Sequence, residues 1–421
     1  MLRPRVPAQH LIVRRSPHIC AALALAVAIS GCSTAPTRTT LPKPAPHIRF
    51  RPAATPTHTL LPIPVMPSTR STIVAAVRHA TCQPAGATGL DTAMVASSYE
   101  RITGRVNAYG CQVAIYIPPA AHNVVLKDLA ISNASEHAVF AQNASQIAIT
   151  DSRVSVSAAA ANTTLGSAPP PPEDKTIVLV GTTDALVEYN VLAGNWNLGI
   201  SVTDDGPVDP AADRPGIPSA ARGNAVIGNM LSGGVRGCGI VVAAYNPGEG
   251  VTNNLIAANT LKNVTPGGIV IAADPPGTAA IGNVVQDNVI WHNQLPGVIV
   301  HSNSAGQTVS DTVVTGNTIV DSGTMPSYLK FLGILGGHRT GVAILGFSVA
   351  PQGTVVSHNV ISGEHYGIYQ ADAAGTRLAG NTVMNLRQRG REFFSLPHLP
   401  PGSSSYYEGP DYYHASPPSS P

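Results

Sequence analysis

From residue 224 to residue 300 the chain repeats one pattern of apolar and polar positions three times. Each copy has two short runs of Val, Ile and Leu around an Asn, and a Gly nine or ten residues later opens a third apolar run. The three Asn residues are Asn229, Asn259 and Asn288, spaced by 30 and 29 positions. A fixed period of this length is typical of a solenoid, in which successive repeats stack on one continuous core.

The apolar residues within each copy predict short β-strands. Val, Ile and Leu alternate with small or polar residues, so that one set faces a core and the other faces outward. Three short strands per repeat, each followed by a bend, are typical of a right-handed parallel β-helix, whose turns stack at the ~4.8 Å spacing of paired strands. Less perfect copies extend the array from Asn123 to Asn381. We therefore expect an all-β, single-stranded right-handed parallel β-helix of about nine turns over residues 121–386.

The Asn in each repeat has a structural explanation. Asn tolerates left-handed backbone dihedrals, and its amide bonds to nearby backbone, so it suits a tight bend. Copies in successive turns would also bond to one another as a ladder. We expect this role for Asn190, Asn229, Asn259, Asn288, Asn317, Asn359 and Asn381.

The segment before the array predicts a cap. Residues 73–120 are expected to form an N-terminal cap and a first turn, because the terminal repeat of a solenoid must cover the open end of its core. Within it, residues 73–79 and 92–95 are candidates for short helical pieces, whereas residues 112–117 predict a strand.

The ends of the chain lack the repeat pattern. Residues 32–72 are rich in Pro and Thr and predict an extended tether. Residues 387–421 predict a disordered Pro, Ser and Tyr tail.

The first 31 residues predict an export signal. Basic residues precede an apolar run, residues 19–29, which is too short to span a bilayer as a helix. The run ends in Ile29-Ser30-Gly31-Cys32, which resembles the bacterial lipobox, where the Cys thiol is diacylated. This resemblance implies lipid attachment at Cys32 and a protein anchored to the bacterial membrane, facing the periplasm or the cell surface.

Composition and charge limit the kinds of partner that the protein is expected to bind. Charged residues make up 11% of the chain, while Gly (40) and Pro (37) are abundant, which suits strands and turns. The formal charge is +2, and it becomes about −2 without the four Arg residues of the export signal. No basic stripe with interleaved aromatics is present, so the sequence argues against a nucleic-acid partner. We expect a monomer.

Three of the five cysteines remain after export and lipidation. Cys82 and Cys111 flank the segment before the repeats and are a candidate disulfide, which an exported protein permits. Cys238 lies between two glycines before an apolar strand and is most simply a small buried thiol. No CxxC or His/Cys spacing indicates a metal site, so we expect no cofactor and leave only Ca²⁺ open.

The repeat unit resembles a known group of proteins. Asn-x-Val/Ile followed by Gly-Ile-x-Val, with residues 110–117 leading in, is similar to bacterial right-handed β-helix repeat proteins of the pectate-lyase-like superfamily, over about residues 105 to 386. The resemblance implies the fold. It says little about activity, because the superfamily includes lyases, hydrolases, epimerases, tailspikes and proteins of no known activity.

One candidate site follows from aligning the turns on their Gly. The residues six positions later are Asp205, Tyr245, Asp274, Asn303 and Phe347. Asp205 and Asp274 would lie two turns apart, roughly 9 to 10 Å between backbones. Carboxylates about 6.5 to 9.5 Å apart suit an inverting glycosidase.

Other side chains of this edge have roles in that hypothesis. Tyr245 and Asn303 would contact the sugar, and Asp204 and His301 would tune pKa or bind a cation. The alternative is that Asp and Asn here are turn formers, as in Asp-Asp-Gly and Ala-Asp-Pro-Pro-Gly.

A second candidate site lies in the insertion 322–340. It brings together Tyr328, Lys330, His338 and Arg339 in a chain poor in Lys and aromatics. A cation that neutralises a uronate carboxylate, with Tyr or His as base, is what polysaccharide β-elimination or epimerisation requires. The same residue types also occur in ordinary exposed loops.

The motifs of enzymes in the superfamily are mostly absent. Polygalacturonase-like enzymes use an Asp-Asp pair and a Gly-His-Gly, of which only Asp204-Asp205 is present, and the Asp-Pro-His-Asp/Glu box of mannuronan epimerases is missing. A third relative, the periplasmic β-helix protein of copper-enzyme maturation, predicts clustered His or Met ligands, whereas the 14 His are scattered and Met is scarce. We therefore favour an envelope protein that binds polysaccharide or peptidoglycan, or serves as a structural rod. The alternative is a polysaccharide-acting lyase, glycoside hydrolase or epimerase.

Overall fold

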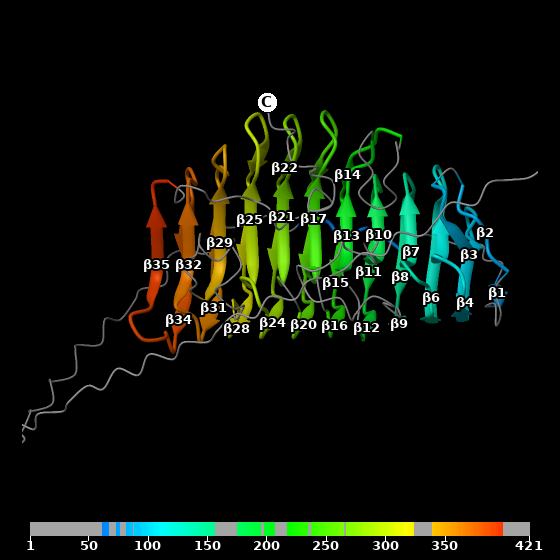
Figure 1. Ribbon diagram of the computed structural model, residues 1–421, viewed down its shortest axis with the longest axis horizontal. Helices are drawn as coiled ribbons and strands as arrows, with labels where there is room; N and C mark the ends of the chain where they lie inside the picture. The colour runs from blue at the N-terminus through cyan, green and yellow to red at the C-terminus, as the bar shows by residue number, and fades with distance from the viewer. Residues whose placement is uncertain are drawn as a thin grey trace, which may run out of the picture. The chain divides into compact units, whose positions relative to one another are not determined.

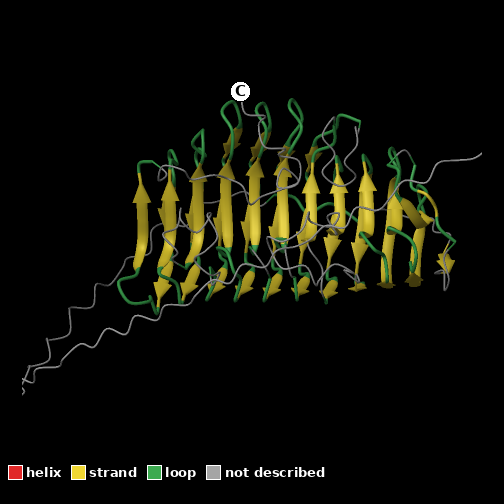
Figure 2. Ribbon diagram, in the orientation of Figure 1, coloured by secondary structure: helices red, strands yellow, loops and turns green. Residues whose placement is uncertain are grey.

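The computed structural model describes residues 61–66, 73–75, 81–86, 88–155, 175–194, 198–206, 217–234, 237–264, 267–323 and 339–398. All of them belong to the compact unit Pro52–Pro421. Every regular element in these ranges is a strand (Figure 2). None of the described residues forms a helix with the length and apolar character that crossing a membrane requires.

The strands stack as a parallel β-helix (Figure 1). One turn consists of β19 (Leu255–Ala257), β20 (Thr260–Lys262), β21 (Ile269–Ala273) and β22 (Ala279–Ile281). The next turn begins with β23 (Val284–Gln286), which pairs in parallel with β19. Corresponding strands of successive turns pair in the same way, which is the predicted all-β architecture.

Three sheets result from this stacking. The 12-stranded sheet, called here the main sheet, contains β2 (Gln83–Pro84), β3 (Asp91–Val95), β5 (Val113–Ile117), β7 (His137–Gln142), β10 (Lys175–Val180), β13 (Leu198–Thr203), β17 (Ile240–Ala244), β21, β25 (Val298–Ser302), β29 (Thr340–Gly346), β32 (Tyr366–Ala371) and β35 (Arg391–Leu396). The 4-stranded sheet contains β14 (Ala221–Arg222), β18 (Val251–Thr252), β22 and β26 (Thr308–Ser310).

The 19-stranded sheet forms two adjacent columns. The first column contains β1 (Ile73–Ala75), β4 (Arg101–Asn107), β6 (His122–Ser132), β8 (Ser145–Thr150), β11 (Leu186–Glu188), β15 (Ala225–Ile227), β19, β23, β27 (Val313–Thr315), β30 (Val355–Ser357) and β33 (Arg377–Ala379). The second column begins with the C-terminal halves of β4 and β6 and continues with β9 (Arg153–Ser155), β12 (Val191–Ala193), β16 (Met230–Ser232), β20, β24 (Val289–Trp291), β28 (Thr318–Val320), β31 (Val360–Ser362) and β34 (Thr382–Met384).

The inward side chains form one continuous core. In β17, Ile240 and Val242 belong to the cluster that fills the helix, while Val241 and Ala243 face outward and are also buried. The main sheet is thus covered on both faces, as its uninterrupted apolar runs indicate. In the second column the pattern alternates instead, because Leu261 is buried while Thr260 is partly exposed and Lys262 is exposed. The two regions therefore differ in how much of their outer surface remains open.

The Asn ladder is present at the corner between the two columns. Each amide donates to the Oδ1 of the Asn one turn further on, at 2.9–3.0 Å, from Asn190 through to Asn381. A second ladder joins Asn224, Asn254 and Asn283. Six of the seven predicted members are completely buried, with Asn381 partly buried at the end, so the amide pairs replace the hydrogen bonds with water that burial removes.

The prediction that each ladder Asn itself adopts left-handed backbone dihedrals was wrong. The left-handed backbone belongs to the residue before each ladder Asn, such as Tyr189, Ala258 or Asp287, each with φ near 54°. That residue turns the chain outward, while the Asn side chain points into the corner and meets its neighbours. Asn is required for its amide and not for its backbone freedom.

A close approach between backbones explains the Gly at the start of the main-sheet strands from β13 onward. A Cβ on Gly268 would lie 2.3 Å from the carbonyl oxygen of Gly297 in the next turn. Only a residue without a side chain allows these two backbones to stack.

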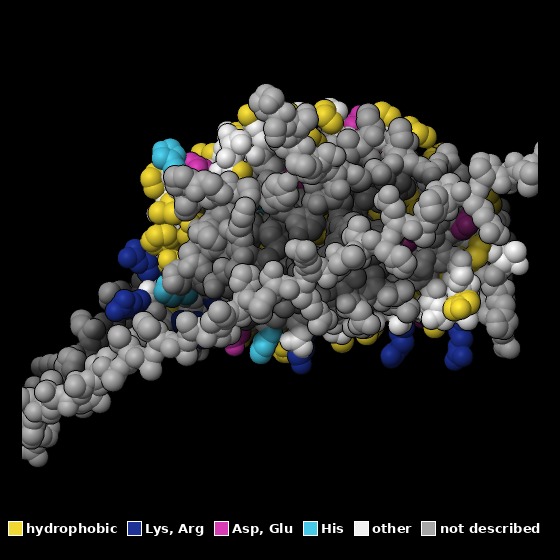
Figure 3. Space-filling model, viewed as in Figure 1, with side chains coloured by type: hydrophobic (Ala, Val, Ile, Leu, Met, Phe, Trp, Pro, Cys, Tyr) yellow, Lys and Arg dark blue, Asp and Glu magenta, His cyan; other side chains and the backbone are white. Residues whose placement is uncertain are grey.

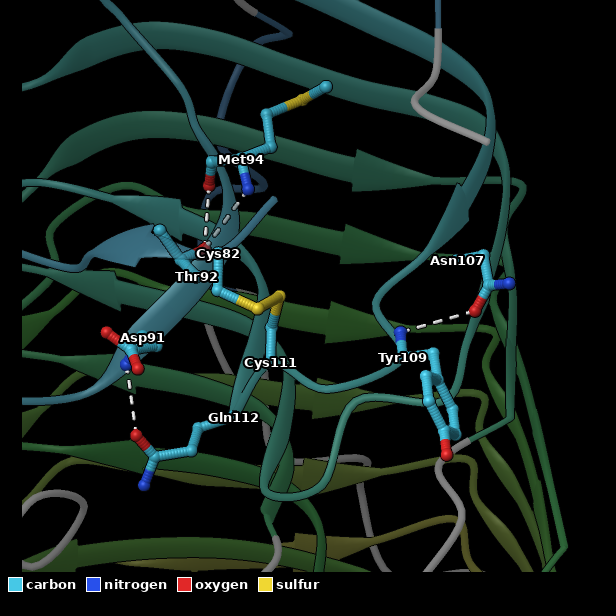
Figure 4. The surroundings of a disulfide bond; sticks show 8 residues. All are labelled: Cys82, Asp91, Thr92, Met94, Asn107, Tyr109, Cys111 and Gln112. Atoms are coloured by element: carbon cyan, nitrogen blue, oxygen red, sulfur yellow. Dashed lines mark hydrogen bonds between the residues drawn. A yellow bond between two sulfur atoms is a disulfide. The ribbon is translucent and has the colours of Figure 1, made fainter. Parts of the chain in front are cut away.

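The N-terminal segment corrects the expectation of helical pieces. Ile73–Ala75 is strand β1, paired with β4, and Asp91–Val95 is strand β3, paired in parallel with β5. Pairing with the neighbouring turn satisfies their backbone, which overrides weak local preferences. The structure contains the Cys82–Cys111 disulfide, which ties the start of β2 to the segment before β5 (Figure 4).

The strand array extends further at the C-terminal end than the sequence indicated. β35 pairs in parallel with β32, so stacking continues to Leu396, beyond the predicted end at residue 386. Eight main-sheet strands fall between residues 121 and 386, and others precede and follow them. The predicted export signal, Cys32 and residues 399–421 lie outside the described residues.

Candidate functional site

The register places the predicted acidic residues on one edge of the main sheet. Thr203 pairs with Ala243, and Ala243 pairs with Ala272. Two residues further along each chain segment are Asp205, Tyr245 and Asp274. The backbone therefore places these three residues in the expected order along the edge. Their chemical role depends on the direction in which their side chains point.

Asp205 is completely buried and accepts several hydrogen bonds. Its Oδ2 accepts from the amides of Gln142 at 3.0 Å and Asn143 at 2.6 Å and from the backbone N–H of Ile217 at 3.2 Å. Its backbone pairs with Ser219 in both directions. The carboxylate thus fastens the two ends of the insertion that contains residues 207–216 onto an earlier turn. These contacts indicate that Asp205 has a structural role.

Asp274 faces the opposite direction. Its Oδ1 accepts a hydrogen bond from the amide of Asn303 in the following turn, and its side chain is only 6% exposed. Tyr245, between the two acids, is 4% exposed. The two carboxylates are therefore held by neighbours on opposite sides, and neither is presented to solvent as a general acid or base would be.

Two further titratable groups near this edge have shifted pKa values. Burial raises the pKa of Asp204 to about 6, although the backbone N–H groups of Tyr245 and Asn246 donate to its carboxylate. Burial lowers the pKa of His301 to about 3, so this imidazole is neutral at physiological pH. Its Nδ1 lies 3.0 Å from Oδ1 of Asn303. His301 is thus a buried, neutral packing residue here, in edge-to-face contact with Phe347.

The second predicted site is only partly described. Tyr328, Lys330 and His338 lie outside the described residues. Arg339 is described and binds Asp321 at 3.2 Å, and Arg387 binds the same carboxylate at 3.2 Å. Arg339 is therefore already paired within the protein.

The outer side of the second column forms a surface that was not predicted from the sequence. Each strand there presents two outward side chains on either side of a buried one, and the register aligns these side chains in two rows. We call this surface the open face. One row consists of Arg105, Ala130, Arg153, Val191, Met230, Thr260, Val289, Thr318, Val360 and Thr382, and the other of Asn107, Ser132, Ser155, Ala193, Ser232, Lys262, Trp291, Val320, Ser362 and Met384.

None of these twenty residues is buried, and none is Asp or Glu. The signal for this surface was present in the repeats, because for most of the turns the rows are the first and third residues after each ladder Asn. The alternation alone does not tell which outer side of the stack stays uncovered, so it did not single out this surface.

A pocket of about 830 Å³ lies at the N-terminal end of the open face. It is lined by residues of β4, β6, β9 and β12, including Arg105, Arg153 and the side chains of Asn107, Ser132 and Ser155. Both arginines are exposed, and within the described part of the chain neither forms an ion pair. Figure 3 shows Lys and Arg side chains projecting from the lower edge of the molecule, where Figure 1 places β4 and β9.

The open face also carries an aromatic ring. Trp291 is 37% exposed, and the ammonium of Lys262 in the preceding turn lies 5.9 Å from the centre of its ring. Met230, Val360 and Met384 are exposed in the same rows. The surface thus combines cations, hydroxyls, amides and an apolar platform.

A family model described as "Periplasmic copper-binding protein (NosD)" matches residues 219–392, which is less than half of the chain. Copper would require clustered ligands of the His, Cys or Met type. The described residues contain no group of three or more His, Cys, Asp or Glu side chains that could hold a metal ion. The part of the chain that the structure describes therefore offers no such cluster of His or Cys ligands, and we derive no chemistry from a copper ion. A search of the curated proteins finds no match.

Solved structures resemble the chain in fold. The tailspike protein of E. coli bacteriophage HK620, in a mutant form with bound pentasaccharide, is 10% identical with a TM-score of 0.51, covering 80% of this chain and 56% of the tailspike. The A-module of mannuronan C-5 epimerase AlgE4 from Azotobacter vinelandii is 13% identical with a TM-score of 0.49, covering 77% and 89%. An exopolygalacturonase from Thermotoga maritima is 13% identical with a TM-score of 0.47, covering 66% and 56%. The repeat pattern, the stacked parallel strands and the Asn ladder together identify this chain as a right-handed parallel β-helix protein with the pectate-lyase-like fold.

Proposed function

We propose that this protein is a non-catalytic, carbohydrate-binding β-helix of the bacterial cell envelope, attached to the membrane through a lipidated Cys32. The observation that carries the proposal is the open face, a surface of aligned hydroxyl, amide, cationic and aromatic side chains on stacked strands. Its ligand would be a polysaccharide or peptidoglycan strand.

The state of the two carboxylates of the main-sheet edge supports the non-catalytic part of the proposal. A general acid or base must reach the substrate within hydrogen-bond distance. Asp205 is buried under three donors, and Asp274 is bonded to Asn303. Releasing either side chain would leave buried donors without acceptors, at a cost of about 1–3 kcal/mol for each group.

Carbohydrate fits the open face for geometric reasons. Stacked strands repeat their side chains every ~4.8 Å, which is of the order of the advance of one sugar along an extended glycan. Sugar hydroxyls can exchange hydrogen bonds with Ser132 and Ser155, and the apolar face of a sugar ring can pack on Trp291. A glycan lying along the stacking direction would meet an equivalent surface in each turn.

The envelope location rests on different support. The lipobox-like sequence ending in Cys32 favours lipid attachment, and the matching family model describes periplasmic proteins. The tailspike of similar fold was solved in complex with a pentasaccharide, which supports the proposal of a glycan ligand.

A binding assay with purified protein tests the proposal. Titration against a panel of envelope and extracellular polysaccharides should give saturable binding to at least one, without release of reducing ends or unsaturated products. Trp291→Ala should weaken that binding about three- to tenfold, because it removes an aromatic contact of about 0.5–1.5 kcal/mol.

Tyr99→Ala is the matched control, since Tyr99 is an exposed aromatic outside the open face. Turnover of any polysaccharide that Asp274→Ala abolishes would contradict the non-catalytic assignment. The absence of binding across the whole panel would contradict the assignment to carbohydrate.

A further inference from the structure

We infer that the pocket at the N-terminal end of the open face is a subsite for anionic sugars, in which Arg105 and Arg153 pair with acidic groups on one polysaccharide chain. The inference rests on the proposed function, because it names the class of glycan that the open face would take. The pocket lies outside residues 219–392, the part matched by the family model.

The charges around the pocket support an anionic ligand. Some basic residues of the described chain are paired with acids: Lys127 with Asp151 at 2.9 Å, and Arg339 and Arg387 with Asp321. Arg105 and Arg153 have no such partner there, and no residue of either row on the open face is acidic. Two free guanidinium groups on one wall of a pocket attract anions and repel cations.

The spacing of the two arginines favours a polymer. Arg105 pairs in register with Ala130, and Ala130 pairs with Arg153, so the two cations lie two strand steps apart, about 9–10 Å between backbones. Side chains that extend outward from backbones this far apart present two separate contact points for acidic groups. An extended chain with acidic groups on sugars two positions apart can contact both at once, with the ring between them above Ala130.

The remaining residues that line the pocket suit the uncharged parts of an anionic polysaccharide. Ala130 is exposed and small, which leaves room for a sugar ring between the arginines. The hydroxyls of Ser132 and Ser155 lie in the adjacent row, and the amide of Asn133 donates to Asn107 at 2.8 Å, which orients that side chain. Val191 and Ala193 close the pocket with apolar surface.

Guanidinium chemistry sets the preference within the anionic class. An Arg can form two parallel hydrogen bonds to one carboxylate or one phosphate group, so both polyuronates and phosphate-bearing polymers match its geometry. We assign the pocket to carboxylated glycans, because the rows beyond it offer hydroxyl and aromatic groups that a bare polyphosphate would not use.

The test compares an anionic glycan with its neutral ester and with a polyanion that contains no sugar. The full chain is titrated with polygalacturonate, with the same polymer after methyl esterification of its carboxylates, and with inorganic polyphosphate. We expect polygalacturonate to bind more tightly than the ester, and Arg105→Gln and Arg153→Gln each to weaken its binding about tenfold, with a further loss as salt rises. Arg377→Gln, at an exposed Arg of β33, should leave binding unchanged.

The outcomes that would contradict the anionic subsite can be told apart from those that would contradict carbohydrate binding as a whole. Equal binding of the acid and the ester would overturn the anionic subsite while carbohydrate binding stands. Polyphosphate binding that needs both arginines, without binding of any glycan, would overturn the proposed function and the assignment to sugars. An equal loss in Arg377→Gln would show a non-specific charge effect and overturn the subsite. Thermal unfolding of each variant verifies that it is folded.

Discussion

The acidic edge of the main sheet and the open face of the second column use polar residues in opposite ways. On the edge, Asp204 and Asp205 are completely buried and receive hydrogen bonds from other turns. On the open face, Arg105, Arg153 and Lys262 are exposed, each next to a buried apolar side chain of its strand. Both regions belong to the same stack and follow the same register. The difference teaches that in this β-helix an aligned polar side chain is available to a ligand only where its side of the sheet remains uncovered.

The largest expected effect comes from removing Asp205. Asp205→Ala should destabilise the protein by about 3–5 kcal/mol. The buried amide of Gln142 and the backbone N–H groups that donate to the carboxylate would lose their acceptor. Chemical denaturation monitored by circular dichroism measures the change, with Asp205→Asn as a milder companion. A loss below about 1 kcal/mol would mean that the carboxylate is dispensable for folding, which would reopen a chemical role.

The disulfide should have an effect of nearly the same size. It closes a loop with a sequence separation of 29 residues. The double variant Cys82→Ala/Cys111→Ala should lower the free energy of unfolding by about 3–4 kcal/mol in the loop-entropy description. Cys238→Ala, at the buried free thiol, is the control for loss of a sulfur atom without loss of a crosslink. Equal stability of the double variant and the wild type would show that the disulfide does not stabilise the N-terminal turns.

A buried acid at the other end of the stack gives a pH-dependent prediction. Glu364 is fully buried in the structure, accepts from the backbone N–H of Ser322 at 2.7 Å, and has its pKa raised to about 8, mainly by burial. Asp321 raises this pKa further, whereas Arg339 and Arg387 lower it. The folded protein therefore keeps a proton that the unfolded chain releases above its ordinary pKa of 4.5, and stability falls as pH rises from about 4.5 to about 8.

Replacing Glu364 with Gln should remove this dependence. Glu364→Gln should match the wild type near pH 4.5 and exceed its stability by roughly 2–4 kcal/mol at pH 9, since the amide has no charge to bury. Urea unfolding at the two pH values measures the difference. A wild-type stability that stays flat between pH 5 and pH 9 would contradict the assignment of a protonated Glu364.

The smallest effect on stability is expected on the open face. Arg105→Gln and Arg153→Gln should change the free energy of unfolding by less than about 0.5 kcal/mol, as is usual for exposed positions without partners. The same denaturation experiment as for Asp205 measures this change. A large destabilisation here would place the arginines among the structural residues and remove the contrast with the acidic edge.

Much of the fold was readable from the sequence. The period, the alternation and the recurrent Asn and Gly predicted the parallel β-helix and the ladder from Asn190 to Asn381, and the Gly alignment predicted the register of Asp205, Tyr245 and Asp274. The helical pieces at 73–79 and 92–95 were wrong where the structure describes them, as β1 and β3, because a few residues carry too little local preference to resist pairing with a neighbouring turn. Array length was underestimated at its C-terminal end, where β35 has the weak pattern of a partly exposed strand.

The sequence by itself determined the repeat, the register and the stacking residues, because these depend on periodic burial and on hydrogen bonds between equivalent positions. Tertiary structure alone decided the directions of the carboxylates, the place of the left-handed residues before the ladder Asn, and the surface that stays open. Whether a polar side chain is locked or free depends on what packs over it from other turns and insertions, and no period along the chain records that.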